Sequence, residues 1–487
     1  IAISLILLIL LIKYHFNYWN RRGIPQLKPA FPLGDYNRIL TEKLPIAVTV
    51  AKIYEETHRK YPIVGTYCTL HPILIVNDFQ LLKKIYVNDF QCFSSRGCYP
   101  DEVNDPLSAN LVFTDGEDWK RMRQLLTPLF TPAKVKSFYQ IMNDTSKVLE
   151  NHIEKNFRNF EEIEILNLCG RFMTDIIASL AFGITVNSID NPHEKFRQIG
   201  ESVFDIESPM GVLRQLGSSV LPALKKYFKI YFVSKDVENF MISTVENLIE
   251  YREKNQIYRQ DLMQLLMNFK ETENFNVAQI TAQAFVVFLA GFESTSITAT
   301  YCMYELAKHP ELQEKLHSEI DQHLDNEGNL NYDSIMKMNF LDACVNETLR
   351  KHPPISLTMR KCTQPYHIPE LNVTINKDEC LFVPIMGFHR DPDFFPEPMR
   401  FKPDRFLNQE VGSDTPFQPF ALGPRYCIAS QLGKIMVKLC LVGYLSKFKY
   451  ESSDDGTEEL KIAQKTMLIK PDKEIYLKIS KRICNKI

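Results

Sequence analysis

One cysteine, Cys427, stands inside the stretch FALGPRYCIA, residues 420 to 429. Gly423 and Pro424 shape the backbone ahead of it, and a run typical of a helix follows. Four roles are open to a cysteine held in this way. It could fill the core, form half of a disulfide, occupy one corner of a zinc site, or bind a group that needs a single thiolate.

The remaining cysteines argue against two of these roles. The chain has 11 cysteines, and no two of them form a Cys-x-x-Cys pair. A large body that faces the cytosol keeps its thiols reduced. The nearest other cysteine, Cys440, lies in an apolar helical stretch, where a buried core thiol is the expected role. A disulfide or a structural zinc site at Cys427 is therefore disfavoured.

The residues around Cys427 suit a planar anionic ligand. A thiolate near a helix N-terminus is stabilised by the helix dipole and by free backbone N–H groups. Gly423 would let the backbone pass flat against a bulky planar ligand, and Arg425 could reach an anionic group on the edge of that ligand. One thiolate, a planar ligand and peripheral carboxylates together describe heme.

The stretch AGFESTSIT, which begins at Ala290, is a second candidate for chemistry. Ala290 and Gly291 leave a bare patch on the longest expected helix, and Glu293 puts a carboxylate into an otherwise apolar run. The hydroxyls of Ser294 and Thr295 follow. A buried acid of this kind has a perturbed pKa and exchanges protons with water. The alternative is a Ser/Thr-rich kink beside a solvated glutamate.

The stretch NETLRKHPP places Glu347 and Arg350 three residues apart on one helical face. This spacing alone predicts only a surface ion pair worth about 0.2–0.5 kcal/mol. The same Glu-x-x-Arg spacing recurs at Glu56, Glu194 and Glu397. Context separates the Glu347 pair, because a proline pair ends its helix and PDRF, with Arg405, follows a proline-rich stretch.

In these stretches the chain resembles the cytochrome P450 superfamily of heme-thiolate monooxygenases, and most closely its microsomal, insect-type members. The resemblance covers nearly the whole chain. The family's heme loop, Phe-x-x-Gly-x-Arg-x-Cys-x-Gly, is matched at Phe420, Gly423, Arg425 and Cys427. Ala429 replaces the final glycine, a departure from which we expect small effects.

The resemblance implies a role for each candidate. Cys427 would be the axial ligand of heme b. Glu293 would relay protons to bound dioxygen together with Ser294 or Thr295, and the sequence leaves open which hydroxyl acts. The implied cofactor-binding residues are Ala290 and Gly291 beside dioxygen, Trp119, Arg123 and Arg360 near the propionates, and Phe420, Gly423 and Arg425 in the loop. The same cations would otherwise be solvated on the surface.

Glu347, Arg350 and Arg405 would form a buried network that braces the heme loop. Bidentate pairing of guanidinium with carboxylate explains why arginine, and not lysine, is needed there.

The chain contains no Gly-x-Gly-x-x-Gly or Walker-type loop, so its electrons must come from a partner. The family's membrane-bound members use NADPH–cytochrome P450 reductase, with cytochrome b5 sometimes assisting. Lys120, Arg121 and Lys434 could form a basic docking patch for such a partner, or simply a solvated face. The net charge of -2 argues against nucleic-acid binding.

We expect an apolar pocket and hence a small lipophilic substrate, xenobiotic or endogenous. The expected lining is 100–113, 203–220, Phe285, Phe288, Ala290, 355–359 and the loop near Met467. A heme-thiolate isomerase or dehydratase acting on a peroxide is the first alternative, and relatives of that kind typically lose the acid and alcohol pair that Glu293 and Ser294 supply. A non-catalytic heme sensor is the second.

The first residues differ from the rest, because Ile1 to Ile12 form an unbroken apolar run. We interpret residues 1–22 as a membrane anchor whose start is missing, with Trp19 at the interface and Arg21 and Arg22 on the cytosolic side. The alternative is a cleaved signal peptide, but no small-x-small site follows. This interpretation implies a proline-rich hinge at 23–34, a catalytic domain at 35–487 and attachment to the endoplasmic reticulum membrane.

The elements that position these residues are mainly helices. The longest is expected from about Val277 to Lys308, ended by Pro310. Strand patterns predict one hairpin in 62–76 and a second in 367–385, which turns at NKDE. The fold class is therefore mainly α with small sheets, and the resemblance implies the cytochrome P450 fold, a helix-rich triangular body.

Overall fold

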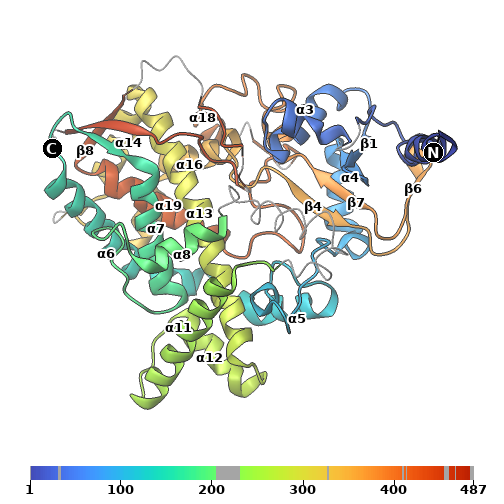
Figure 1. Ribbon diagram of the computed structural model, residues 1–487. Helices are drawn as coiled ribbons and strands as arrows, with labels where there is room; N and C mark the ends of the chain where they lie inside the picture. Colours follow the sequence, from blue (N-terminus) through green and yellow to red (C-terminus); the bar gives the residue numbers. More distant parts are fainter. Residues whose placement is uncertain are drawn as a thin grey trace.

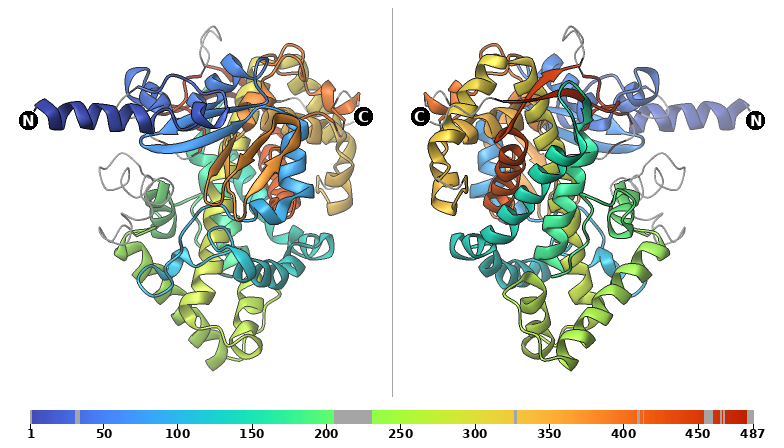
Figure 2. Two further views of the ribbon diagram at one scale, coloured as in Figure 1. Left: turned by 90° about the vertical axis from the view of Figure 1, so that its right-hand side faces the viewer. Right: turned by 90° about the vertical axis from the view of Figure 1, so that its left-hand side faces the viewer.

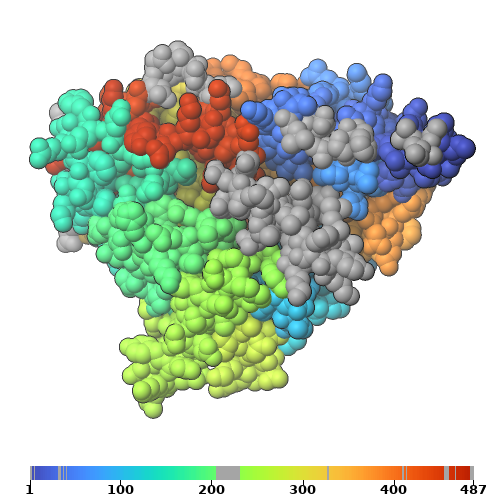
Figure 3. Space-filling model, viewed as in Figure 1, coloured from blue at the N-terminus to red at the C-terminus, as the bar shows by residue number. Residues whose placement is uncertain are grey.

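The computed structural model is rich in helices, with small sheets on two sides of the body: the sheet that contains β8 lies at the left of Figure 1, and the sheets that contain β1, β4, β6 and β7 lie at its right. It describes residues 2–30, 34–204, 231–325, 328–408, 411–412, 414–453, 460–464, 466 and 468–482. The helices gather around α13, and α11 and α12 form the narrow end of the body, which is plain in the space-filling view (Figure 3). This is the expected mainly α class.

Most of the helices bury an apolar face against the body, and α1, whose apolar side chains are exposed, is an exception. The helices are α1 (Ala2–His15), α2 (Arg38–Thr41), α3 (Ile46–Thr57), α4 (Phe79–Lys83), α5 (Gly116–Leu126), α6 (Pro132–Asn156), α7 (Ile165–Ala181), α8 (Lys195–Phe204), α11 (Lys235–Lys254), α12 (Leu262–Thr272), α13 (Val277–Lys308), α14 (Pro310–His323), α15 (Tyr332–Lys337), α16 (Asn339–Lys351), α17 (Ile385–His389), α18 (Asp404–Leu407) and α19 (Ser430–Leu445).

Helix α13 has the bounds that the sequence predicts. Asn276 caps its start, since the Asn276 side chain accepts from the Gln279 N–H and the Gln279 side chain accepts in return. The helix packs along α7 and α19 and is buried over most of its length. It is long and apolar enough to cross a membrane, yet 72% of its most apolar window is buried inside the protein, as in a core helix.

The strands are β1 (Ile63–Cys68), β2 (His71–Val76), β3 (Glu162–Glu164), β4 (Thr358–Lys361), β5 (Tyr366–Ile368), β6 (Val373–Ile375), β7 (Cys380–Val383), β8 (Phe448–Ser452) and β9 (Tyr476–Lys481). They form three sheets, ordered β1-β2-β7-β4, β3-β9-β8 and β5-β6 among the described residues. The first hairpin is confirmed, with Ile63 opposite Val76 and Cys68 opposite His71.

The second predicted hairpin is wrong in its pairing. The strands on either side of NKDE, β6 and β7, belong to different sheets: β6 pairs with β5, whereas β7 lies between β2 and β4. The alternation of apolar residues was real, but the buried strand β7 finds its partners on distant segments. Local pattern does not determine which strands pair.

The segment that follows α1 packs into the body. Trp19 is fully buried, and a side chain at Gly65 of β1 would overlap its ring. Arg22 pairs with Glu379, whose carboxylate also accepts from Tyr18. The interfacial position expected for Trp19 is therefore wrong, because the indole serves as core.

Part of the segment predicted as a hinge also contacts the body. Gly65 donates its N–H to the carbonyl of Pro25 (2.7 Å) and accepts from the N–H of Leu27 (3.2 Å), so this segment lies along the edge of β1. Helix α1 itself projects from the body with its apolar side chains exposed (Figure 2).

Candidate active site

Cys427 lies at the end of a tight turn, just before α19. Its N–H donates to the carbonyl of Phe420 (2.9 Å), and the N–H of Tyr426 donates to the carbonyl of Gly423 (2.9 Å). Burial raises the pKa of the Cys427 thiol, while the backbone N–H of Ala429 and the nearby Arg123 and Arg96 oppose that rise. The turn therefore presents one thiol beside donors and cations that favour its anion.

Gly423 is required by packing within the protein. Its φ of 70° is in the left-handed region, and a Cβ there would overlap the backbone carbonyl of Tyr86. This differs from the reason inferred from sequence, which was a close approach to a planar ligand. The glycine instead fixes the cysteine turn against the segment that follows α4.

One side of α13 is open although its neighbours are buried. Ala290 is exposed and Ser294, one turn later, is half-exposed. A side chain at Gly291, by contrast, would meet Ile177 of α7. The bare patch predicted for this helix is thus narrower than expected, because the missing side chain of Gly291 admits α7.

The two candidate hydroxyls point to different surroundings. Ser294 belongs to the open side and donates to the carbonyl of Ala290 (2.6 Å). Thr295 is buried, donates to the carbonyl of Gly291, and has its methyl group beside Gly433 of α19. Because Cys427 shortly precedes α19, this contact brings α13 near the cysteine turn at the helical turn that carries Ser294 and Thr295.

Glu293 is buried on α13, where burial raises the pKa of its carboxyl. Lys470, from the loop before β9, lies 3.6 Å from its Oε1 and lowers that pKa in part. The Lys470 side chain is partly exposed, so this ion pair connects the buried Glu293 carboxyl to solvent. A carboxyl whose pKa is raised in this way holds its proton to a higher pH than a free carboxyl does, and it can pass that proton on.

Arg425 extends from the cysteine turn into a buried pocket of polar groups. Its guanidinium donates to Asp115 Oδ1 (2.7 Å) and to the carbonyls of Ser94 (3.0 Å) and Thr114 (2.9 Å). It also lies over the ring of Trp119, 4.2 Å from the ring centroid. Trp119 thus supports the cysteine turn through Arg425.

Arg123, one turn after Trp119 on α5, contacts the cysteine turn directly. It donates to the carbonyl of Tyr426 (2.9 Å) and lies over the Tyr426 ring. Phe420 is half-buried and packs against the main core. The predicted residues of α5 and of the loop are therefore brought together around Cys427.

Two further arginines surround the same pocket, and one of them, Arg96, was missed by the sequence interpretation. Arg96 donates to the carbonyl of Arg425 (3.1 Å), and burial followed by repulsion from Arg360 lowers its pKa to about 10. Arg360 is buried, and its Nε has no hydrogen-bond partner. Burial, then repulsion from Arg96, lowers the pKa of Arg425 to about 9.

These arginines leave a surplus of buried positive charge. Within the described part of the chain, Arg96 and Arg360 form no ion pair, and Asp115 alone pairs with Arg425. Buried cations need anionic partners or hydrogen-bond acceptors. A ligand that carries two carboxylates would supply them, so the donor set fits heme and its propionates, beside a cysteine suited to bind the iron.

The predicted brace is present. Arg350 donates to both oxygens of Glu347 (2.7 and 2.8 Å), and Arg405 donates to Glu347 Oε1 (3.2 Å). The N–H of Lys402 donates to the same oxygen (2.9 Å). Glu347 and Arg350 are 0% exposed. This carboxylate therefore binds α16 to α18 and to the proline-rich stretch.

His389, which the sequence interpretation also missed, connects the brace to the cysteine turn. Arg350 donates to its carbonyl (2.9 Å), and its Nε2 accepts from the N–H of Gln418 (2.9 Å). The N–H of Ala421 donates in turn to the carbonyl of Gln418 (3.0 Å). Burial and the charge of Arg350 lower the pKa of His389 to about 3, so its ring is neutral and its Nε2 can accept.

The three cations of the predicted docking patch all have acidic partners. Lys120 lies 3.7 Å from Glu117, Arg121 pairs with Glu273 at 2.7 Å, and Lys434 pairs with Asp342 at 2.9 Å. Lys434 also lines a surface pocket of about 530 Å³ behind the cysteine turn, together with Gln418, Phe420 and Ala421. Only Lys434 therefore adjoins the loop that holds Cys427.

The predicted substrate pocket is only partly described. Phe288 is buried, and it packs against Phe196 (ring centroids 4.7 Å apart) and beside Gly200, so its place in the pocket stays a prediction. Phe285 is buried as well, and Ala290 remains on the open side of α13. Residues 205–220 and Met467 lie outside the described residues.

Comparison with known proteins agrees with a heme site at Cys427. The family model described as Cytochrome P450 matches residues 43–479. Probable cytochrome P450 6d4 of Drosophila melanogaster is 33% identical over 97% of this chain and 96% of its own length. Probable cytochrome P450 6a13 of the same species is 34% identical over 97% and 96%. Cytochrome P450 6d1 of Musca domestica is 31% identical over 96% of both chains.

The Cys427 turn presents one thiol beside several buried arginines, and helix α13 lies near it with part of one side exposed. These features are those of a heme-thiolate protein. More particularly, the chain belongs to the cytochrome P450 family and is of the insect type. Members of this family are heme-binding monooxygenases, and they depend on a redox partner for electrons.

Proposed function

We propose that this protein inserts one oxygen atom from O2 into a small lipophilic substrate, with electrons from NADPH delivered by a separate NADPH–cytochrome P450 reductase and in part by cytochrome b5. Heme bound to a thiolate supplies the activation of dioxygen, since the thiolate pushes electron density toward the iron. The observation that carries this proposal is the half-exposed Cys427 turn beside the open side of α13.

In this proposal Cys427 binds the iron, while Arg96, Arg360 and Arg425 face the propionates. The surface pocket beside Lys434 is where the electron donor would dock. Membrane attachment through the apolar α1 at the endoplasmic reticulum, with the body on the cytosolic side, is supported by the exposed apolar side chains of that helix.

The test is the carbon monoxide difference spectrum of the reduced protein, run beside NADPH consumption with added reductase and a panel of lipophilic compounds. We expect a thiolate-type spectrum and substrate-dependent product formation. A thiolate-type spectrum without reductase-dependent turnover, but with rearrangement of a lipid peroxide, would instead favour the isomerase or dehydratase alternative. A spectrum without either activity would favour the sensor.

We further propose Ser294, rather than Thr295, as the hydroxyl of the proton relay, because Ser294 lies on the open side of α13. Replacing Ser294 by alanine is expected to lower the product formed per NADPH oxidised by up to about 100-fold, which is the lower end of what a positioned proton donor contributes. Thr295→Ala is the matched control and should retain most of that yield. A larger loss in Thr295→Ala would contradict the assignment.

Lys470 is expected to set the pH range of the relay through Glu293. A protonated carboxyl can donate, so product yield should fall as pH rises through the pKa of Glu293. Lys470 lowers that pKa. In Lys470→Met the pKa of Glu293 should therefore rise, and the fall in product yield at alkaline pH, the alkaline limb, should move to higher pH.

The measurement for this prediction is product per NADPH from about pH 5 to about pH 9, because burial can raise a glutamate pKa to as much as about 8–9. Lys473→Met, an exposed lysine nearby, is the control and should leave the limb in place. If the alkaline fall in product yield were unchanged in Lys470→Met, Lys470 would have no part in the proton relay.

A further inference from the structure

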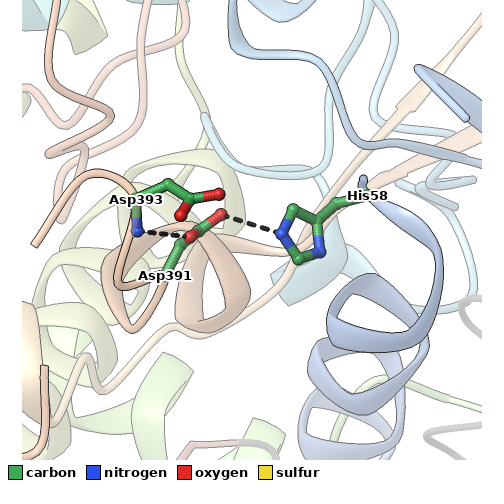
Figure 4. A group of neighbouring side chains, drawn as sticks. All are labelled: His58, Asp391 and Asp393. Carbon is green, nitrogen blue, oxygen red and sulfur yellow. Dashed lines mark hydrogen bonds and ion pairs between the residues drawn. The ribbon is translucent and has the colours of Figure 1, made fainter. Parts of the chain in front are cut away.

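A group of three side chains outside the active site has the composition of a metal centre. His58 follows α3, and Asp391 and Asp393 follow α17, and their ligating atoms all lie within 4.8 Å of one another. Figure 4 shows the His58 ring pointing from α3 toward the Asp391 carboxylate, beside which the Asp393 carboxylate lies. Two loops that are far apart in sequence therefore meet at one imidazole and two carboxylates.

The imidazole is oriented as a ligand would be. Its Nδ1 lies 2.9 Å from the carbonyl of Tyr54, and a carbonyl oxygen only accepts, so Nδ1 carries the proton. In the neutral ring the Nε2 lone pair then faces Asp391 Oδ2 at 3.4 Å, and this Nε2 is buried without a hydrogen-bond partner. Two acceptors facing each other repel unless a cation or a proton lies between them.

The carboxylate opposite is also held in place. The Asp391 side chain is 1% exposed, its Oδ2 accepts from the Tyr54 hydroxyl (2.6 Å), and its Oδ1 accepts from the N–H of Asp393 (2.9 Å). Metal-binding histidines and carboxylates are typically oriented by such outer hydrogen bonds, the histidine through its second nitrogen. Both patterns are present here, around one residue, Tyr54.

The second carboxylate, that of Asp393, can turn to complete the site. Asp393 is paired with Arg59 (2.9 Å), and the two side chains are 56% and 65% exposed. An exposed pair of this kind contributes little to stability, so turning Asp393 toward His58 costs little. One nitrogen and two oxygen ligands with an open fourth position suit zinc, whereas calcium and magnesium prefer oxygen ligands alone.

We propose that His58 Nε2, Asp391 and Asp393 bind one Zn²⁺ ion, with water as the fourth ligand. The ion links α3 to the segment after α17. That segment directly follows His389, which connects the brace to the cysteine turn, so the ion would stabilise the fold rather than take part in the reaction.

The test uses the full-length, heme-loaded protein, purified without a polyhistidine tag. Zinc bound per chain is measured by mass spectrometry, and Zn²⁺ affinity by calorimetry after chelation. We expect one zinc per chain, a higher melting temperature with zinc, and a loss of affinity of about ten-fold or more in Asp393→Asn, as for disrupted metal sites in general. Asp393 is exposed, so this variant is expected to fold.

His152 and Asp190 provide the matched control, because they form a histidine–aspartate pair (2.7 Å) in which the aspartate is also 56% exposed. Asp190→Asn should leave zinc affinity and melting temperature unchanged. Zinc that binds equally well to Asp393→Asn, or no saturable zinc at all, would overturn the proposal and leave His58 and Asp391 as a contact between α3 and the segment after α17.

Discussion

Replacing Glu347 by glutamine is expected to lower the free energy of unfolding of the heme-loaded protein by about 3–5 kcal/mol, the usual cost of leaving a buried charge without its partner. Glu347 accepts from two guanidinium groups and from one backbone N–H, and it is fully buried. Glutamine keeps the shape but removes the charge that both arginines need. The measurement is denaturant unfolding, followed by tryptophan fluorescence and heme absorbance.

The chain offers a control with the same spacing. Glu397 and Arg400 also stand three residues apart, but their side chains are 63% and 66% exposed. Glu397→Gln is expected to change stability by less than about 0.5 kcal/mol. If Glu347→Gln and Glu397→Gln lowered the free energy of unfolding by similar amounts, burial would not distinguish the two pairs. The Glu347 network would then not be a special stabilising feature of this fold.

Replacing Cys427 by alanine is expected to abolish monooxygenase turnover. The turn holds this one sulfur beside Arg123 and Arg96, and the described part of the chain places no second cysteine in it. With carbon monoxide, the reduced variant should lack the absorption band of thiolate-bound heme. Because the described part of the turn contains no other thiol that could bind the iron, we expect the band and the turnover to be lost completely.

Cys92→Ala is the control for this experiment, because Cys92 is also half-exposed but lies outside the turn. It should keep the spectrum and the turnover. A Cys427→Ala protein that retains both would contradict the assignment of the iron ligand while leaving the family and the fold intact.

The active site could be predicted wherever several residues occur at fixed local spacing. The loop around Cys427, the run from Ala290 to Thr295 and the bounds of α13 all depend on neighbours in sequence, and helix caps and turns are local as well. Glu347 shows the limit, because its spacing to Arg350 equals that of exposed pairs. Burial separated them, and burial is a property of the folded chain.

The missed residues have no local signature. Arg96 lies in a loop and His389 is the last residue of the short helix α17, and they matter only because distant segments place them beside Arg425 and Gln418. Strand β7 is similar, since its partners come from β2 and β4, far away in sequence. The sequence places Trp19 at a membrane interface because tryptophan is common there. In the structure its ring instead fills the space that Gly65 leaves.

The burial of Trp19 has a mechanical consequence. Because this indole is enclosed by β1 and Arg22 is held by Glu379, α1 and the first sheet can turn only together. A flexible joint would leave the angle between α1 and the body variable, whereas these contacts hold the segment at the base of α1 in one orientation against the first sheet.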